Sequence, residues 1–168
     1  MNAEAAQAFD HTLRFGIPVR FIWLRDAASL YGENGIAPAT SSSAGIDLRA
    51  CTEEPETVFA PGSRFAIGSG IAIEPLFPWI AGFVYSRSGL GAVHGLTVSQ
   101  GVGVIDPDYR GEIVVNLLNT SGEERRIKRG DRIAQLIFQP FARPRLENVK
   151  TLEETSRGAG GFGHTGSR

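Results

Sequence analysis

The sequence predicts an all-β protein with the architecture of a sandwich, a jelly roll or a distorted barrel. Apolar residues alternate with a period of two along short segments, turn residues fill nearly every gap between those segments, and only one stretch has the composition of a helix. A chain of 168 residues is long enough for one domain with its own core. We therefore expect a single domain built from many antiparallel strands.

The alternating segments are the expected strands. In chain order they are PVRFIWL (18–24), RFAIGSGIAIE (64–74), WIAGFVYS (79–86), EIVVNLLN (112–119) and RIAQLIFQPF (132–141). Turn-forming residues separate them in YGENG, EEPE, APGS, DPDYRG, TSGEE and KRGD. The one expected helix is a turn or two after Ser88, in SGLGAVHG.

The two ends of the chain depart from the strand pattern. Residues 1–16 contain acidic residues and only a weak helical pattern, so we expect a loosely ordered extension and no transit peptide. Residues 17–152 form the expected β domain. Residues 153–168 carry RGAGGFGHTG, in which half of the residues are glycine. A frayed terminus is one interpretation. A flexible lid is the other, because linkers seldom combine an arginine, an aromatic ring and a hydroxyl.

Charge and cysteine content narrow the expected partners and compartment. The formal net charge of −1 provides no general attraction for nucleic acid or an anionic membrane. Cys51 is the single cysteine and cannot form an intrachain disulfide, and no apolar run has membrane-spanning length. We expect a cytoplasmic protein without nucleic-acid or membrane partners, in which any phosphate is bound by a local cluster.

Five short stretches stand apart from the strand pattern. They are AGIDLRA (44–50), SRSGLG (86–91), GVIDPDYRGE (103–112), RGDRIAQLIF (129–138) and RGAGGFGHTG (157–166). In this order and spacing they resemble the five motifs of the trimeric dUTP pyrophosphatases (dUTPases), and the resemblance covers residues 17–168. It implies a distorted jelly roll that assembles as a homotrimer with shared active sites. It also implies Mg²⁺ as cofactor and hydrolysis of dUTP to dUMP and pyrophosphate.

The first motif places Asp47 in an apolar strand context. By itself, a carboxylate between Ile46 and Leu48 fits a surface residue on an edge strand equally well. Magnesium keeps several waters and is commonly held through carboxylates and substrate phosphates. In the family the matching aspartate reaches a metal-bound water, so the resemblance implies that Asp47 contacts the metal through water.

The second and fourth motifs supply the expected phosphate-binding residues. Arg87, Ser88 and Gly89 lie at the start of the one expected helix, where free N–H groups and a guanidinium suit an anion, although Ser88 could also be a simple N-cap. Gln135 is a neutral polar residue in an apolar run and needs a partner if it is buried. The resemblance implies that all four of these residues face the phosphate chain.

The third motif is predicted to form a hairpin that binds the base and the sugar. Its glycines let main chain approach a ligand closely. The resemblance assigns uracil binding to Gln100, Val104 and Ile105, stacking on the deoxyribose to Tyr109, and activation of the attacking water to Asp106. Asp106, Pro107 and Asp108 would also suit a simple turn. Gln100 stands where many relatives have asparagine.

The fifth motif is the expected lid. Because phosphoryl transfer depends on positioning and charge stabilisation, an arginine on a mobile segment can complete such a site. The resemblance assigns this role to Arg157 and stacking on uracil to Phe162. It assigns contacts to the outer phosphates to Gly163, His164 and Thr165, although His164 replaces the serine of some relatives.

Two other functions compete with dUTP hydrolysis. A dCTP deaminase shares this fold but needs a glutamate over the pyrimidine C4, and Glu112 is the nearest carboxylate to that position. A non-catalytic nucleotide-sensing module would be expected to lack Asp106 or the tail, and both are present.

Overall fold

The computed structural model describes residues 16–33 and 35–161, and over this part of the chain it confirms the all-β prediction. The strands are β1 (Val19–Trp23), β2 (Ile46–Arg49), β3 (Glu56–Phe59), β4 (Arg64–Gly68), β5 (Ile71–Pro75), β6 (Ile80–Tyr85), β7 (Leu96–Val98), β8 (Val102–Ile105), β9 (Val114–Asn119), β10 (Arg125–Lys128) and β11 (Arg132–Pro140). The helices are α2 (Ala28–Tyr31) and η1 (Gly89–Val93).

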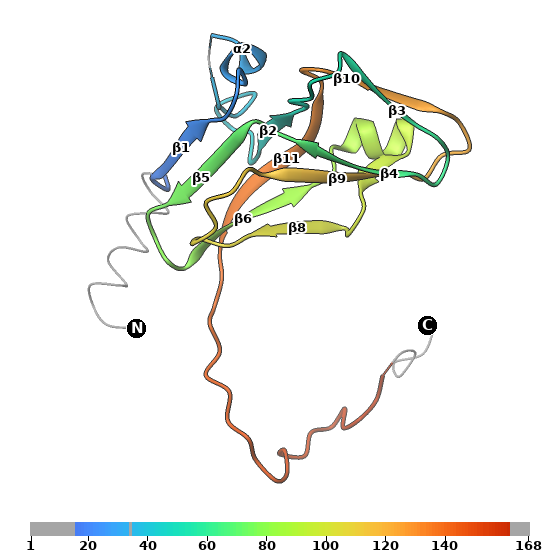
Figure 1. Cartoon of the computed structure of the whole chain (residues 1–168). Coiled ribbons are helices and arrows are strands. Elements are labelled where there is room, and N and C mark those ends of the chain that lie inside the picture. The colour runs from blue at the N-terminus through green and yellow to red at the C-terminus, as the bar shows by residue number, and fades with distance from the viewer. Residues whose placement is uncertain (1–15, 34, 162–168) are drawn as a thin grey trace.

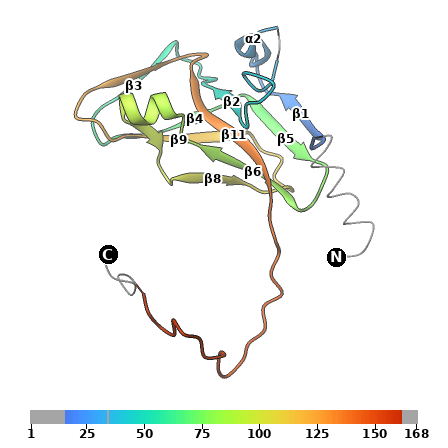
Figure 2. The same ribbon diagram turned by 180° about the vertical axis from the view of Figure 1, so that it is seen from behind.

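All strand pairs are antiparallel. The largest sheet has the order β2-β11-β6-β8, a second sheet has the order β4-β9-β7, and β1-β5 and β10-β3 form two-stranded sheets (Figures 1 and 2). Sequence neighbours seldom pair, so distant segments lie side by side in a jelly-roll-like arrangement. One consequence is that β2, which carries Asp47, is an edge strand beside β11.

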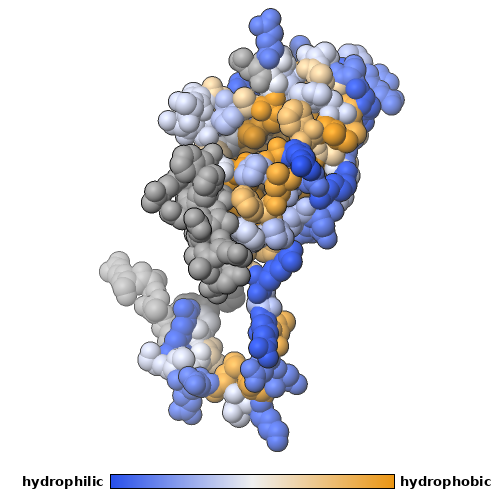
Figure 3. Space-filling view, turned by 90° about the vertical axis from the view of Figure 1, so that its left-hand side faces the viewer, coloured by the Kyte–Doolittle hydropathy of each residue, from blue (hydrophilic) through white to orange (hydrophobic). Residues whose placement is uncertain are grey.

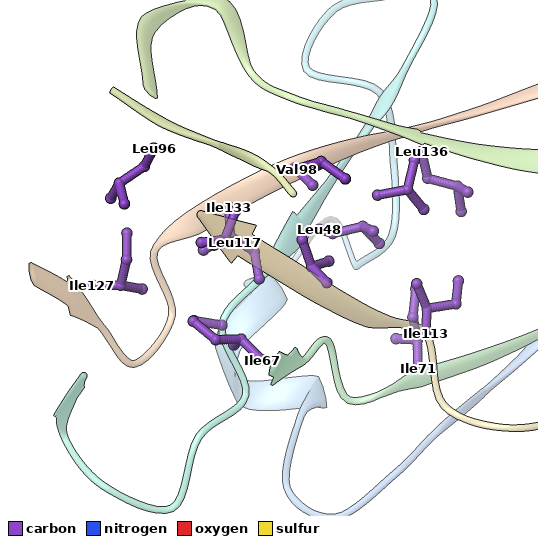
Figure 4. Close-up of a cluster of buried hydrophobic side chains, with 14 of the residues drawn as sticks. Leu48, Ile67, Ile71, Leu96, Val98, Ile113, Leu117, Ile127, Ile133 and Leu136 are labelled. Atoms are coloured by element: carbon purple, nitrogen blue, oxygen red, sulfur yellow. The ribbon is translucent and has the colours of Figure 1, made fainter. Parts of the chain in front are cut away.

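The core lies between the sheets. Alternation along β9 buries Val115, Leu117 and Asn119 on one face, as a period of two requires. The buried side chains drawn in Figure 4 come from both larger sheets and include Leu48, Ile67, Leu96, Val98, Ile113, Ile133 and Leu136. Asn119 satisfies its buried amide through the carbonyls of Phe59 and Glu123 and the amide of Ser121.

The expected strand 64–74 is in fact two strands. Gly70 lies between β4 and β5 with a φ of +73°, which glycine adopts without strain. A Cβ at this position would collide with the side chains of Ala27 and Cys51. The chain therefore turns here because only glycine fits, and the alternating pattern continues on both sides of the turn.

The prediction of a single helix is wrong. The expected segment after Ser88 forms the short π-helix η1, but α2 is a second, four-residue helix. Its short length hides it in the sequence, because one turn shows no period of 3.6. It is held by tertiary contacts: Tyr31 is buried, and its hydroxyl donates to the Ser69 carbonyl at 2.9 Å and accepts from the Arg49 amide at 3.1 Å.

The chain leaves the sheets after β11 as an extended arm, residues 141–161. The arm runs away from the strands in both ribbon views (Figures 1 and 2). Leu146 and Leu152 on the arm are 89% and 86% exposed. The boundary predicted near residue 152 is not visible as a change of structure, because strand pairing already ends at Pro140.

Neither α2 nor any other helix within residues 16–33 and 35–161 is long and apolar enough to cross a membrane. The predicted extension lies almost wholly outside the described residues, since only its last residue, Gly16, is described.

Candidate functional site

The third sequence motif forms a hairpin around a small pocket. The pocket has a volume of about 250 Å³ and lies where β8, the turn after it and the start of β9 meet. It is lined by Val84, Val98, Gln100, Gly103, Val104, Ile105, Asp106, Tyr109, Glu112, Val114 and Val115. The structure thus brings together every residue that the sequence placed in the hairpin site. The apolar walls and the few polar groups suit a flat, partly polar ligand.

The hairpin turn fixes the position of Tyr109. The Tyr109 amide donates to the Asp106 carbonyl at 3.1 Å, which closes the Asp106–Tyr109 turn expected from the sequence. The Tyr109 hydroxyl donates to the Glu112 carbonyl at 3.0 Å. The phenol lies so close to Gly111 that a Cβ there would overlap it. Tyr109 is still 44% exposed, so part of its ring is free to contact a ligand.

The glycines of the hairpin do not share one role. A Cβ at Gly103 would press against Val84 of the neighbouring strand β6 at 3.2 Å, so this glycine is needed for strand packing. A Cβ at Gly101 would meet no atom within 4 Å among the described residues, and Gly101 instead has a φ of +82°. Strand packing explains the glycine at 103, and the positive φ explains the glycine at 101. Neither position requires the expected close approach of a ligand.

A second group of predicted residues gathers around Asp47. Its carboxylate accepts from Arg87 Nε at 2.8 Å and from Arg132 Nη1 at 3.2 Å. The sheet register aligns Asp47 on β2, Gln135 on β11 and Tyr85 on β6 in one row. Arg132 was not among the predicted site residues, although it lies inside the fourth motif and is a second cation there.

Ser88 and Gly89 lie beside this group at the start of η1. Both are exposed, and within the described residues the Ser88 side chain makes no capping hydrogen bond. Ser88 therefore occupies the N-cap position of η1 without the side-chain hydrogen bond of a capping residue. Arg87, Gly89 and Arg132 line a surface pocket of about 580 Å³, together with His94 and Arg125 among others. Exposed main-chain donors beside two guanidinium groups can bind an anion.

The two groups form separate parts of the described chain. The hairpin pocket and the Arg87 pocket have no lining residue in common. Arg157 lines neither of them: it lies on the arm, where its Nε donates to the Gly160 carbonyl at 3.1 Å. The remaining predicted lid residues, Phe162, Gly163, His164 and Thr165, lie outside the described residues.

The donor set around Asp47 suits a magnesium ion held mainly by phosphates. Residues 16–33 and 35–161 contain no group of three His, Cys, Asp or Glu side chains that could hold a metal by themselves. An ionised carboxylate has about four lone-pair sites. Because Arg87 and Arg132 use two of them, Asp47 retains acceptor capacity for a metal-bound water.

The fold is jelly-roll-like, with a small pocket for a flat group and a separate arginine cluster. These features are typical of a β protein that binds phosphorylated ligands. A family model described as dUTPase matches residues 34–166, and the chain belongs to this family. The predicted family and fold are thereby confirmed.

Bacterial relatives agree with this assignment. The deoxyuridine 5'-triphosphate nucleotidohydrolase of Xanthomonas oryzae pv. oryzae (strain PXO99A) is 48% identical over 132 residues, which cover 79% of this chain and 84% of the relative. The protein of the same name from Psychrobacter arcticus is 49% identical over 129 residues, which cover 76% of this chain and 83% of the relative.

Solved structures share the fold. The dUTPase of Staphylococcus bacteriophage 80alpha with dUPNHPP has a TM-score of 0.75 at 24% identity, covering 89% of this chain and 98% of that one. A mutant dUTPase from phage phi11 of S. aureus, described with a structural Mg(II) ion, has a TM-score of 0.68 at 21% identity. The match covers 82% of this chain and 99% of that one.

Proposed function

We propose that the chain hydrolyses dUTP to dUMP and pyrophosphate, with the hairpin pocket holding the deoxyuridine. Membership of the dUTPase family and bacterial relatives at 48% identity support this activity. The observation that carries the proposal is the hairpin pocket itself. It gathers Gln100, Asp106 and Tyr109 around a volume of about 250 Å³, which suits a pyrimidine nucleoside rather than a larger group.

Each part of the site has a distinct task. Asp106 is exposed at the pocket and orients the water that attacks the α-phosphorus, accepting its proton. Main chain at Val104 and Ile105 and the amide of Gln100 bind the uracil edge. The exposed face of Tyr109 stacks on the sugar and leaves no room for a 2'-hydroxyl.

The phosphate chain lies over the Asp47 group. Arg87, Ser88 and Gln135 bind its oxygens, and Arg157 with the tail residues Phe162, Gly163, His164 and Thr165 closes over the nucleotide. Asp47 would hold a magnesium ion through one of its waters, and the ion would supply positive charge that neutralises the phosphates.

We propose that the active enzyme is a homotrimer in which each site is shared. The absence of a common lining residue between the two pockets supports this, as does an arm that leaves its own sheets. Apolar side chains also gather on the face formed by β1 and β5 (Figure 3), where Phe21 and Ile22 are 44% and 59% exposed. Such a face suits contact between copies of the chain.

We place the reaction in the cytoplasm, where the nucleotide pool lies. The buried free thiol of Cys51 suits a reducing compartment. The absence of nucleic-acid partners stays a prediction from the net charge of −1.

A pyrophosphate-release assay tests the activity. The enzyme is expected to act on dUTP far better than on dTTP, dCTP or UTP, and a chelator is expected to slow it. Equal rates on UTP and dUTP, or release of ammonia from dCTP, would contradict the proposal.

Complementation tests the shared site. Asp106→Asn with an intact tail and a chain ending at Thr155 are refolded together in equal amounts. Random assembly gives about three quarters mixed trimers, and about one quarter of all sites regain activity under three-fold symmetry. No rescue, with mixed trimers confirmed by native mass spectrometry, would show that each tail serves its own subunit.

The deaminase alternative finds no support at Glu112. The Glu112 carboxylate accepts from the Gly70 amide at 2.7 Å and pairs with Arg25. The carboxylate is therefore already bound by two donors of its own fold.

A further inference from the structure

Glu112 lies where the active-site hairpin meets the rest of the fold. It is the last residue of the third motif, and its side chain is 21% exposed at the edge of the hairpin pocket. Its carboxylate oxygen Oε1 accepts from Arg25 Nη2 and from the Gly70 amide. Arg25 is 87 positions away in the sequence and follows β1. We refer to Arg25, Gly70 and Glu112 as the Glu112 cluster.

The surrounding backbone is shaped to accept this carboxylate. A Cβ at Gly68 would overlap the Glu112 carboxylate and contact the Arg25 guanidinium, so a side chain there would force the pair to shift. The Gly70 carbonyl accepts from the Leu24 amide at 2.8 Å, which joins the turn between β4 and β5 to the segment that carries Arg25. Gly68 therefore leaves space for the ion pair, and the Gly70 amide binds its carboxylate.

Arg25 has an unusual backbone conformation. Its φ of +54° lies in the left-handed region, and among the described residues it is the only non-glycine residue with a positive φ. This conformation costs an L-residue roughly 1 to 2 kcal/mol. Such strain persists where the surrounding contacts impose it, and it occurs most often at functional positions.

The cluster is connected directly to Tyr109. The carbonyl of Glu112 accepts from the Tyr109 hydroxyl at 3.0 Å, while the carboxylate of the same residue is bound by Arg25 and Gly70. The position of the Glu112 main chain therefore sets the position of the phenol. Because Gly111 lies under the ring, the ring has little freedom to move toward the backbone.

We propose that Glu112 and Arg25 are positioning residues that fix Tyr109 and thereby determine the preference for deoxyribose over ribose. The inference rests on the proposed function, since it deepens the role given there to Tyr109. A displaced ring leaves space for a 2'-hydroxyl. The cluster acts on the sugar through Tyr109 and touches neither the phosphates nor the attacking water.

The test compares Glu112→Gln and Arg25→Met with Arg25→Lys. The glutamine keeps the shape and the acceptor for Gly70 but loses the charge, and the lysine keeps the charge. For Glu112→Gln and Arg25→Met we expect KM for dUTP to rise roughly tenfold, in line with the loss of a charge-assisted hydrogen bond. We expect the dUTP-to-UTP ratio of kcat/KM to fall by a similar factor, kcat to change little, and Arg25→Lys to retain most of the ratio.

Glu56→Gln is the matched control. Glu56 also pairs with an arginine, Arg126, at 2.7 Å, and its side chain is 28% exposed, close to the value for Glu112. It lies on β3 and lines neither pocket, although its partner Arg126, which also pairs with Glu124, lines the Arg87 pocket. This variant removes the same charge from an ion pair away from the hairpin pocket and is expected to keep the wild-type substrate ratio.

Amide hydrogen exchange gives a second measurement independent of turnover. In Glu112→Gln and Arg25→Met the amides of Gly70 and Tyr109 are expected to exchange faster than in Glu56→Gln. If Glu112→Gln does not fold, Arg25→Met decides the result. Wild-type KM and substrate ratio in the folded variants, or a loss confined to kcat, would overturn the inference. A wild-type chain that is inactive on dUTP would contradict the proposed function instead.

Discussion

The hairpin after β8 and the arm after β11 both carry predicted site residues, but they are held in opposite ways. The hairpin is fixed within its own chain by the turn at Asp106, the Tyr109 hydroxyl and the Glu112 ion pair. The arm is exposed along its length, and Leu146 and Leu152 cover nothing in the described subunit. The hairpin pocket is therefore formed within one chain, whereas Leu146 and Leu152 of the arm are not packed on their own sheets.

Removal of residues 156–168 is expected to have the largest effect on the turnover of dUTP. Turnover of dUTP is expected to fall by about 10³-fold or more, because an arginine that completes a phosphoryl-transfer site contributes this much. The melting temperature and the oligomer size are expected to stay unchanged, since residues 156–159 are exposed. Calorimetry and light scattering check the second point, and an aggregated or dissociated product would show that the arm is structural.

Asp106→Asn tests the fixed region at its catalytic group. A fall in kcat of about 10²- to 10⁴-fold is expected, since asparagine keeps the shape of the turn but cannot accept a proton. KM for dUTP is expected to change little. Steady-state kinetics on the refolded trimer measure both values, and a kcat near the wild-type value would remove Asp106 from the mechanism.

Gly111→Ala tests the geometry of the hairpin instead of its chemistry. The new methyl group displaces the Tyr109 ring, because the phenol occupies that space. We expect KM for dUTP to rise by about 10- to 100-fold, since a misplaced ring loses about 1 to 3 kcal/mol of binding. The double variant with Tyr109→Ala is expected to add little to the effect of Tyr109→Ala alone. Full additivity would mean that Gly111 acts independently of the ring.

Tyr31→Phe is expected to affect stability and leave catalysis unchanged. Loss of its two hydrogen bonds, one buried and one partly buried, costs about 1 to 3 kcal/mol of unfolding free energy, measured by urea denaturation. Burial raises the pKa of Tyr31 to about 12, above its ordinary value of 10. Its contribution is therefore complete below pH 10 and is lost as the pH rises toward 12. The variant is expected to lack this alkaline slope, and a slope equal to that of the wild type would contradict the assignment.

The predicted parts of the fold follow from local pattern. The alternation in VVNLLN and in RIAQLIF is strong because each strand buries one face, and β9 and β11 have nearly the predicted bounds. The strands β3 and β10 lacked this signal. Their sequences ETVF and RRIK carry charged residues that pair with each other across the two strands, as Arg126 and Glu56 do. Such pairing depends on which strands lie side by side in the fold, and a local sequence pattern does not reveal this.

The site shows the same division. The hairpin residues were predictable because they lie close together in the sequence, and in the structure they line one pocket. The pairing of Asp47 with Arg132 joins two strands, and that of Glu112 with Arg25 joins a hairpin to the end of β1. Neither pair has a spacing that a sequence pattern could reveal, because the topology of the sheets brings the partners together.

The ion pairs of Asp47 with Arg87 and Arg132 orient both guanidinium groups within the folded chain. Both guanidinium groups are already oriented, so their conformational entropy is lost when the chain folds and not when a nucleotide arrives. The three charges of this group sum to +1, so Coulomb attraction is stronger for an anion with more negative charge than for one with less. One carboxylate thus keeps both arginines oriented and leaves the group with a net positive charge.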